Sequence, residues 1–356
     1  MGFEDLSSKL FLLQVVKVLF LGVVGFLFSF LLTFLIIEIL RKLNFRKRIR
    51  KETPVFYSLH KEKEGTVTGA GLGFLLSTII LTLGIHYLGK IFNGFWDFLD
   101  FFSRSEVYLP FLTLIISGIV GFFDDFLGVY EIGKQSGGIG WKEKFLVYLG
   151  VGLFVTWWFY VKLSRDTVIL PFLGTIDLGS FYFLFTLFVI LGSLHSANLT
   201  DGLDGLLASV SASILIPLIV ISFLNSYYNL ASFLSLFLGS LIGFSIFNFY
   251  PAKAFMGDAG SVSIGILIGT VSSMLNLQFY LLFFAFIFVL EALSVILQVI
   301  SKKFFKKKIF ISSPIHHHFQ AKGLSEPNIV FKFFVINTIF AIFGFIIYLA
   351  TKIIVL

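Results

Sequence analysis

Four short stretches of the chain carry residues that suit phosphate chemistry. The first is an acid pair, Asp124 and Asp125, at the end of an almost wholly apolar segment. An ionised Asp costs at least about 2.5 kcal/mol in the middle of a bilayer, so adjacent acids need water or a cation nearby. Paired carboxylates suit Mg²⁺ binding or proton abstraction. The alternative is that this pair only marks where a helix leaves the membrane.

The second stretch, residues 198–205, combines an amide and two acids. It begins with Asn198, and Asp201 and Asp204 lie three residues apart, on one face if the segment is helical. It does not match a calcium loop, which needs acids at alternate positions and a Glu at position twelve. Two acids and an Asn in one loop favour a functional site. The alternative is that Asp201 caps the following helix.

The third stretch, residues 255–261, places an acid between glycines before another apolar segment. Asp258 follows Gly257 directly, and Phe255 lies three residues before Asp258. A glycine-flanked Asp at a helix start can hold a metal that binds a diphosphate, while nearby backbone N–H groups receive the anion. Asp258 or Ser261 could equally cap the helix.

The fourth stretch has three consecutive histidines, His316, His317 and His318, in a basic loop. Adjacent residues rarely converge on one tetrahedral zinc ion, and the chain has no cysteine to complete such a site. Phosphate binding or proton transfer is the more plausible role, with solvated loop histidines as the alternative. Asn248 and Lys63 say little individually.

The composition indicates which elements carry these stretches. The chain has 356 residues, of which 57% are hydrophobic and 13% are charged, whereas soluble domains have about 25% charged residues. Apolar runs long enough to span a bilayer predict a single all-α membrane domain over residues 1–356 with about ten spans. We expect them at 15–40, 67–90, 107–127, 145–163, 180–197, 206–224, 230–249, 261–276, 279–301 and 331–354.

Basic residues predict the orientation of these spans. With both termini outside, one side, counted with Lys332 at the start of the last span, carries 20 of the 27 Lys and Arg residues. The positive-inside rule places that side in the cytoplasm. This placement accounts for the net charge of +7, so nucleic-acid binding is not expected. All four stretches fall on this same side, as they would in one active site built from helix ends. Together they indicate Mg²⁺-assisted phosphoryl transfer at the inner membrane.

At these residues the sequence resembles the phospho-N-acetylmuramoyl-pentapeptide transferases, within the polyprenyl-phosphate N-acetylhexosamine phosphate transferase superfamily. The motifs that carry the resemblance are NLTDGLDGL at 198–206, FMGDAGS at 255–261 and PIHHHF at 314–319. The resemblance implies transfer of phospho-MurNAc-pentapeptide from UDP-MurNAc-pentapeptide to undecaprenyl phosphate, which gives lipid I and UMP. A sister transferase that uses UDP-N-acetylglucosamine is the alternative, and a membrane transporter is a further one. A homodimer is one possible assembly.

The resemblance also implies roles for individual residues. Asp258 would bind Mg²⁺, and Asp124 and Asp125 would deprotonate or orient the lipid phosphate. Residues beside the nucleotide would be Asp201 and Asp204, with Asp204, Asn248 and Phe255 in the uridine pocket. Phosphate or sugar-peptide contacts would come from Lys63, Thr68, Lys144, His316, His317 and His318, and we place His317 also among the catalytic residues and Asn198 and Gly257 among those that bind substrate.

Two positions depart from the family pattern. The family usually has a Lys three residues after its acid pair, where this chain has Gly128, a feature shared with the N-acetylglucosamine-using relatives. Lys134 is the candidate to replace that Lys. The second departure is Val67, which stands where the family usually has Pro.

Overall fold

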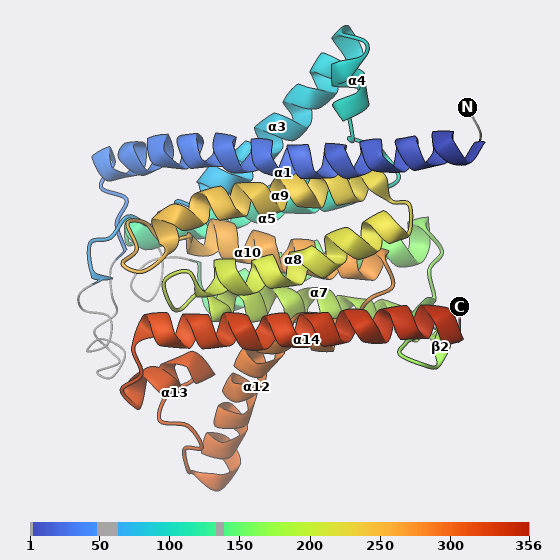
Figure 1. Ribbon diagram of the computed structural model, residues 1–356. Coiled ribbons are helices and arrows are strands. Elements are labelled where there is room, and N and C mark those ends of the chain that lie inside the picture. The colour runs from blue at the N-terminus through green and yellow to red at the C-terminus, as the bar shows by residue number, and fades with distance from the viewer. Residues whose placement is uncertain (1–2, 48–62, 133–138, 356) are drawn as a thin grey trace.

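The computed structural model describes residues 3–47, 63–132 and 139–355, and most of them are helical (Figure 1). The helices are α1 (Phe3–Lys42), α3 (Leu72–Ile91), α4 (Phe95–Leu99), α5 (Tyr108–Val129), α6 (Trp141–Trp157), α7 (Phe181–Thr200), α8 (Leu206–Leu224), α9 (Tyr228–Asn248), α10 (Gly257–Met274), α11 (Leu281–Phe284), α12 (Phe286–Ile300), α13 (Ile315–Ala321) and α14 (Glu326–Ile354). Short π-helical turns extend α6 over Trp158–Lys162 and α12 over Ser301–Phe305.

Within the described residues, eight helices are long and apolar enough to cross a membrane. They are α1, α3, α5, α6 with its extension, α7, α8, α9 and α14. This confirms the prediction of a helical protein with many membrane spans. The predicted spans at 261–276 and 279–301 correspond to α10 and to α11 with α12, which lie outside these eight. The number ten therefore stays a prediction.

Helix α10 occupies the centre of the bundle, which explains its modest hydropathy. It packs between α5 and α7, and every residue from Ala259 to Ser273 is buried. Its sequence is rich in Gly and Ser, small residues that let neighbouring helices approach closely. A Cβ on Gly265 would lie 2.6 Å from the Leu194 Cα of α7, for example. Protein rather than lipid surrounds α10, so it does not need the apolar surface of an outer span.

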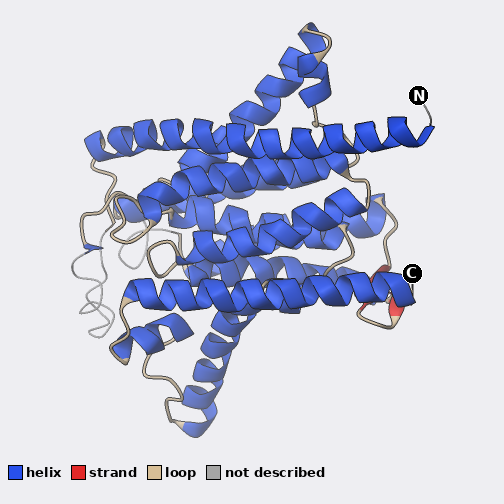
Figure 2. Ribbon diagram, in the orientation of Figure 1, coloured by secondary structure: helices blue, strands red, loops and turns tan. Residues whose placement is uncertain are grey.

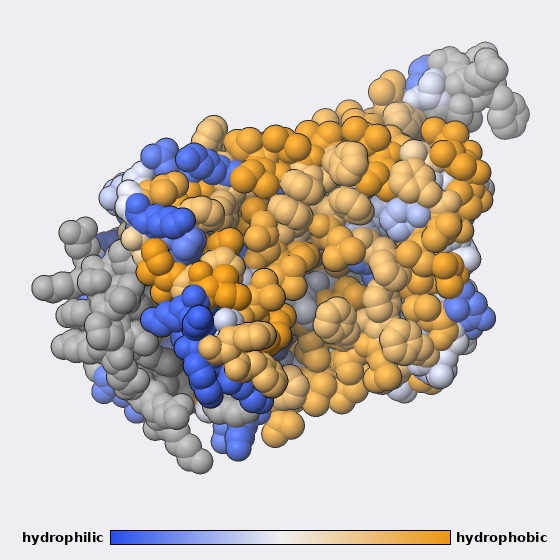
Figure 3. All heavy atoms as spheres, turned by 90° about the horizontal axis from the view of Figure 1, so that it is seen from below, coloured by the Kyte–Doolittle hydropathy of each residue, from blue (hydrophilic) through white to orange (hydrophobic). Residues whose placement is uncertain are grey.

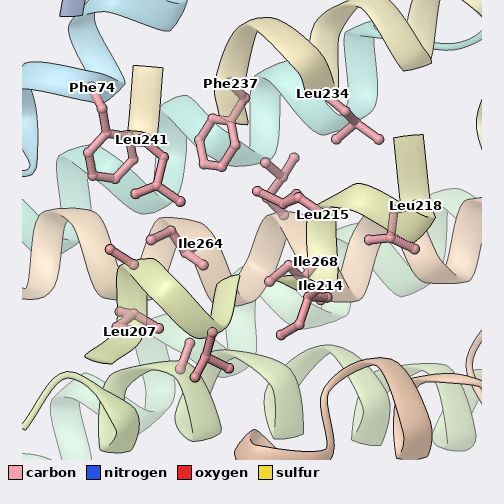
Figure 4. Packing of buried hydrophobic residues seen from close by; sticks show 14 of the residues in the cluster. Phe74, Leu207, Ile214, Leu215, Leu218, Leu234, Phe237, Leu241, Ile264 and Ile268 are labelled. Atoms are coloured by element: carbon pink, nitrogen blue, oxygen red, sulfur yellow. The ribbon is translucent and has the colours of Figure 1, made fainter. Parts of the chain in front are cut away.

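The buried core joins α3, α8, α9 and α10 (Figure 4). Phe74 of α3 meets the Phe237 ring of α9 edge to face, with ring centroids 5.7 Å apart. Ile264 and Ile268 of α10 lie in the same cluster. The outer surface is different: on the face seen in Figure 3, apolar side chains form a broad belt across the middle of the molecule, and hydrophilic ones gather toward its ends. A belt of this kind suits lipid as the surrounding solvent.

A small β-hairpin is the exception to the all-α prediction (Figure 2). Strands β1 (Thr167–Leu170) and β2 (Gly174–Asp177) pair antiparallel, with Thr167 opposite Asp177. The backbone N–H of Phe172, in the turn, donates to Thr351 Oγ1 of α14 at 3.1 Å. The hairpin was missed because four-residue strands give too short an alternating pattern to recognise in sequence.

The chain crosses the bundle so that α1 begins and α14 ends at the same end (Figure 1). The connections α7–α8 and α9–α10, together with α13, lie at the opposite end. All the polar stretches singled out in the sequence are therefore gathered at one end of the molecule. Helix α12 leaves the bundle at a steep angle and leads back to α13.

Candidate active site

The loop before α3 joins the loop before α10 at the polar end of the bundle. Val67 bridges Arg46 on one side and Ala254 on the other. Its carbonyl accepts a hydrogen bond from Phe255 N at 2.8 Å, and Ala70 N donates to the Phe255 carbonyl at 3.0 Å. Residue 67 takes part in this contact through its backbone carbonyl, which any residue supplies, so Val67 is compatible with the fold. Thr68 is buried beside them, and its backbone N–H donates to the Phe45 carbonyl at 3.1 Å.

Four residues from four helices form what we term the carboxylate–lysine cluster: Asp124, Lys144, Asn198 and Asp258. Lys144 Nζ lies 2.8 Å from Asp124 Oδ2 and also donates to Asp258 Oδ2. Asn198 Nδ2 donates to the other Asp258 oxygen at 3.0 Å. The structure thus brings together predicted site residues that lie far apart in the sequence, since Asp124 and Asp258 are separated by 134 positions. One ammonium group stands between two carboxylates, so this site accommodates a positive charge.

Asp125 has different partners from its neighbour. Its Oδ1 accepts from Asp258 N at 2.9 Å and its Oδ2 accepts from Ala259 N at 3.1 Å. These are free N–H groups of the first turn of α10, and a carboxylate there also favours the positive end of the helix dipole. Gly257 has φ +75°, and a Cβ there would lie 2.4 Å from Asp125 Oδ2. Asp125 therefore fixes the start of the helix that carries Asp258.

A second group of residues, the Lys63 cluster, consists of Lys63, Asp204, Asn248, Phe255 and Glu326. Lys63 Nζ lies 2.6 Å from Asp204 Oδ1 and 2.5 Å from Glu326 Oε1. Asn248 Oδ1 accepts from Gly205 N at 3.2 Å, and its Nδ2 donates to the Ala254 carbonyl at 3.1 Å. The Lys63 ammonium also lies 5.8 Å from the centre of the Phe255 ring.

Glu326 was missed in the sequence, where it stood only as an acid at the start of the last apolar run. It is the first residue of α14, and its carboxylate also accepts from Asp204 N. The only signal was that it falls on the same predicted side as the other polar residues. Lys134, the candidate to replace the family Lys, lies outside the described residues.

The three histidines do not converge. His316 and His317 are buried, whereas His318 is partly exposed and its Nδ1 accepts from Ile311 N at 3.1 Å. His317 Nδ1 lies 3.0 Å from Gln320 Oε1. Burial lowers the pKa of His316 to about 3, and Lys63 acts in the same direction. His317 and His318 therefore have different partners, and the role of this run stays a prediction.

Asp201 directly follows α7 and lies in the sequence between Asn198 of the carboxylate–lysine cluster and Asp204 of the Lys63 cluster. Burial raises the pKa of its carboxyl to about 7, although Lys47 and Lys63 act in the opposite direction and Asp258 and Asp204 reinforce the rise. An acid with this pKa can exchange a proton near neutral pH.

Across the described part of the chain, no three His, Asp or Glu side chains are arranged to hold a metal ion by themselves. This does not conflict with Mg²⁺, which usually takes one or two carboxylates and completes its shell with water and substrate phosphates. The two carboxylates around the Lys144 ammonium are a donor set of that kind. The residues present therefore fit a magnesium ion shared with a phosphorylated ligand.

Fold and site together define a polytopic helical membrane protein with a carboxylate–lysine site at one end of its bundle. The family described as "Glycosyl transferase family 4" matches residues 107–276. This range includes in full the four helices that carry the carboxylate–lysine cluster, α5, α6, α7 and α10.

Curated relatives match almost the whole chain. A phospho-N-acetylmuramoyl-pentapeptide-transferase of Thermoanaerobacter sp. (strain X514) is 37% identical over 326 residues, which cover 91% of this chain and 96% of the relative. The protein of the same name from Bacillus subtilis (strain 168) is 36% identical over 328 residues, or 92% and 96% of the two chains. That from Clostridium perfringens (strain 13 / Type A) is 37% identical over 330 residues, or 92% and 98%. The chain belongs to the phospho-N-acetylmuramoyl-pentapeptide transferase family.

Proposed function

We propose that this protein transfers phospho-MurNAc-pentapeptide from UDP-MurNAc-pentapeptide to undecaprenyl phosphate, giving lipid I and UMP. The observation that carries the proposal is the end-to-end similarity to relatives named for this transfer. The carboxylate–lysine cluster supports it, because phosphoryl transfer needs positioned charge around a diphosphate. The apolar belt supports a lipid acceptor, which would reach the site from the bilayer (Figure 3).

In the reaction, an oxygen of the lipid phosphate attacks the β-phosphorus of the nucleotide sugar. The new P–O bond forms as the bond from the β-phosphorus to the bridging oxygen breaks, and UMP leaves with that oxygen. Mg²⁺ bound at Asp258 would neutralise charge on the diphosphate. Lys144, which contacts both Asp124 and Asp258, would supply a further positive charge beside the reacting groups. Asp124 would take a proton from the lipid phosphate when it carries one.

We favour this direct attack over a covalent phospho-aspartate intermediate. Asp125 is committed to the first turn of α10, and Asp124 and Asp258 both hold Lys144, so each acid already has a partner in the resting site. Mixing enzyme with nucleotide sugar labelled at the β-phosphate, without lipid, tests this directly. Label that remains on the denatured protein would contradict direct attack.

The Lys63 cluster is the part of the site that we assign to the nucleotide. Phe255 offers an aromatic face, Asn248 and Asp204 offer polar groups, and Lys63 offers a cation, a combination that suits a uridine with its phosphates. His317 is buried close to His316 in α13, and we assign it to contacts with the phosphates or the sugar of the nucleotide sugar.

We place the protein in the bacterial inner membrane with this site facing the cytoplasm. The relatives are bacterial, and the basic residues predict that the polar end of the bundle is cytoplasmic. UDP-linked precursors would then reach the site from the cytoplasm.

Gly128, a residue shared with the N-acetylglucosamine-using relatives, makes the identity of the nucleotide sugar the part of the proposal to test. UMP release is measured with purified protein in detergent, Mg²⁺ and undecaprenyl phosphate, and with each nucleotide sugar in a separate reaction. We expect release with UDP-MurNAc-pentapeptide only. Release with UDP-N-acetylglucosamine only would assign the chain to the sister branch, and release with neither by folded protein would contradict the proposal.

A further inference from the structure

A buried acid–histidine pair lies outside the two clusters described above. Glu291 of α12 and His316 of α13 are both 0% exposed, and His316 Nδ1 lies 3.0 Å from Glu291 Oε1. A buried acid of this kind is costly unless it is paired, so its place in the fold calls for a role. The transfer chemistry proposed above makes no use of Glu291.

The second ring nitrogen of His316 faces the loop between α7 and α8. A Cβ built on Gly202 would lie only 2.2 Å from His316 Nε2, so the ring edge points at the backbone between Asp201 and Asp204. Considering only the described residues, this buried Nε2 has no hydrogen-bond partner. The imidazole is thus held by a carboxylate on one side and presents a free nitrogen on the other.

Helix α12 also anchors the segment that leads to His316. Gln298 Oε1 accepts from Ile309 N and from Phe310 N, both at 3.0 Å, and its Nε2 donates to the Phe310 carbonyl at 2.8 Å. Ser301 Oγ donates to the Lys307 carbonyl at 2.9 Å. Gln298 therefore holds the same segment as Glu291 without touching the imidazole, which makes it a matched control.

The state of the ring follows from its surroundings. Burial lowers the pKa of His316 to about 3, so the imidazole is neutral and carries one N–H. The partner of one ring nitrogen decides which of the two is protonated. When Glu291 is ionised, its carboxylate can only accept, so its bond to the ring places the proton on Nδ1 and leaves Nε2 as an acceptor.

We infer that Glu291 is a positioning residue that fixes the Nδ1–H form of His316, so that Nε2 presents an unprotonated acceptor at the Gly202 turn. The ligand class that such an acceptor takes is a hydroxyl or N–H donor. In this site the donor belongs to the nucleotide sugar, because the Gly202 turn connects Asp201 and Asp204. This last step rests on the proposed function, whereas the protonation state of the ring does not.

Nitrogen-15 NMR of histidine-labelled protein tests the protonation state without any substrate. The chain has six histidines, and a spectrum of His316→Gln identifies the missing signals. We expect wild-type His316 to show a protonated Nδ1 and a bare Nε2 in alkaline buffer, where Glu291 is ionised. Glu291→Leu should convert the ring to the Nε2–H form, whereas Gln298→Leu should leave it as in the wild type.

A wild-type His316 with its proton on Nε2 would overturn the inference by itself, even if Glu291→Leu does not fold. A Glu291→Leu ring that keeps Nδ1–H would overturn it as well. Glu291→Gln retains an acceptor oxygen of the same shape, so it should preserve the wild-type form.

Kinetics test the consequence for the ligand. We expect Glu291→Leu to raise KM for the nucleotide sugar by about tenfold, which corresponds to about 1.4 kcal/mol, and to leave KM for the lipid phosphate within about twofold. Glu291→Gln should recover most of the lost affinity. Equal effects on both substrates would show a merely structural role and overturn the assignment. If wild-type protein transfers nothing, the proposed function fails while the NMR result still decides the role of Glu291.

Discussion

Asp124 and Asp125 are adjacent in sequence but serve different purposes. Asp124 shares Lys144 with Asp258, whereas both oxygens of Asp125 accept N–H groups from the first turn of α10. In the proposed reaction the first acid would face the reacting groups, whereas the second holds the start of the helix that carries Asp258. Substitution of each by Asn should separate these roles.

Asp125→Asn is expected to lower stability as well as activity. An amide can still accept one N–H but not two, and loss of a helix cap costs about 1 kcal/mol. Asp124→Asn should lower turnover by about 10²-fold or more, in the range of a lost general base, with little change in melting temperature. Thermal denaturation and UMP release on the same preparations check this. Equal loss of melting temperature in both variants would contradict the division of roles.

Asp201 gives a pH dependence with a definite sign. Its pKa is raised to about 7 in the folded protein, above the usual value of 3.8, because burial disfavours the charged form. The neutral form therefore contributes stability that is lost as pH rises from about 4 through 7. Asp201→Asn mimics the neutral form, so its melting temperature should exceed that of the wild type at pH 8, by a margin that vanishes near pH 4. A margin that grows toward low pH would show the opposite shift.

The family resemblance alone singled out Lys63, Lys144 and Phe255, whereas most acids of the two clusters are conspicuous in an apolar chain. Asp258 and Asp204 could be found in this way, but their partners could not. Glu326 stands at the start of an ordinary apolar run, and only the fold brings it within 2.5 Å of Lys63. The different roles of Asp124 and Asp125 likewise depend on which of the two carboxylates reaches the start of α10. The spacing of residues along the chain does not reveal which one does.

At the scale of elements, the position of Asp258 depends on how closely α5 and α10 approach. A Cβ on Gly121 of α5 would lie 2.4 Å from the Asp258 carbonyl oxygen and 2.7 Å from Ala259 Cα. Backbone atoms cannot give way as a flexible side chain can. The absence of a side chain at 121 therefore sets the distance between the two acids of the carboxylate–lysine cluster.

Gly121→Ala should displace the start of α10 and lower both activity and stability. Overpacking of this kind costs about 1–3 kcal/mol, and a shift of about 1 Å can reduce catalysis about 10²-fold. Gly192→Ala, within α7, is the matched control because a Cβ there meets nothing within 4 Å. UMP release and melting temperature are measured for both variants. Full activity of Gly121→Ala would show that this contact does not position Asp258.

The elements that face lipid were the easiest to predict, since long apolar runs identify them. α10 was expected as an ordinary span, yet its Gly- and Ser-rich sequence reflects burial among other helices. The β1–β2 hairpin gave no recognisable pattern, and its stability depends on α14, far away in sequence.

At the scale of the whole molecule, the arrangement predicts that the two ends of the bundle face opposite sides of the membrane. The β1–β2 hairpin lies at the end where α14 finishes, and the basic segment after α12 leads to the polar end (Figure 1). The chain has no cysteine, so single cysteines can be introduced without background.

Leu173→Cys in the hairpin and Lys306→Cys after α12 are both at exposed positions. A membrane-impermeant maleimide should label Leu173→Cys in spheroplasts and should label Lys306→Cys only after the membrane is opened. The reverse pattern would place the site outside the cytoplasm. Labelling of both in intact spheroplasts would contradict the common placement of the polar loops on the inner side.

The most direct test of the account is the stoichiometry of product formation by wild-type protein and by Asp258→Asn. Mass spectrometry quantifies the lipid-linked product, and UMP is measured in the same reaction with UDP-MurNAc-pentapeptide, undecaprenyl phosphate and Mg²⁺. We predict equal amounts of the two products from the wild type, and loss of both on chelation of Mg²⁺ or in Asp258→Asn. Folded wild-type protein that forms no lipid-linked product, or Asp258→Asn that forms it at the wild-type rate, would contradict the account.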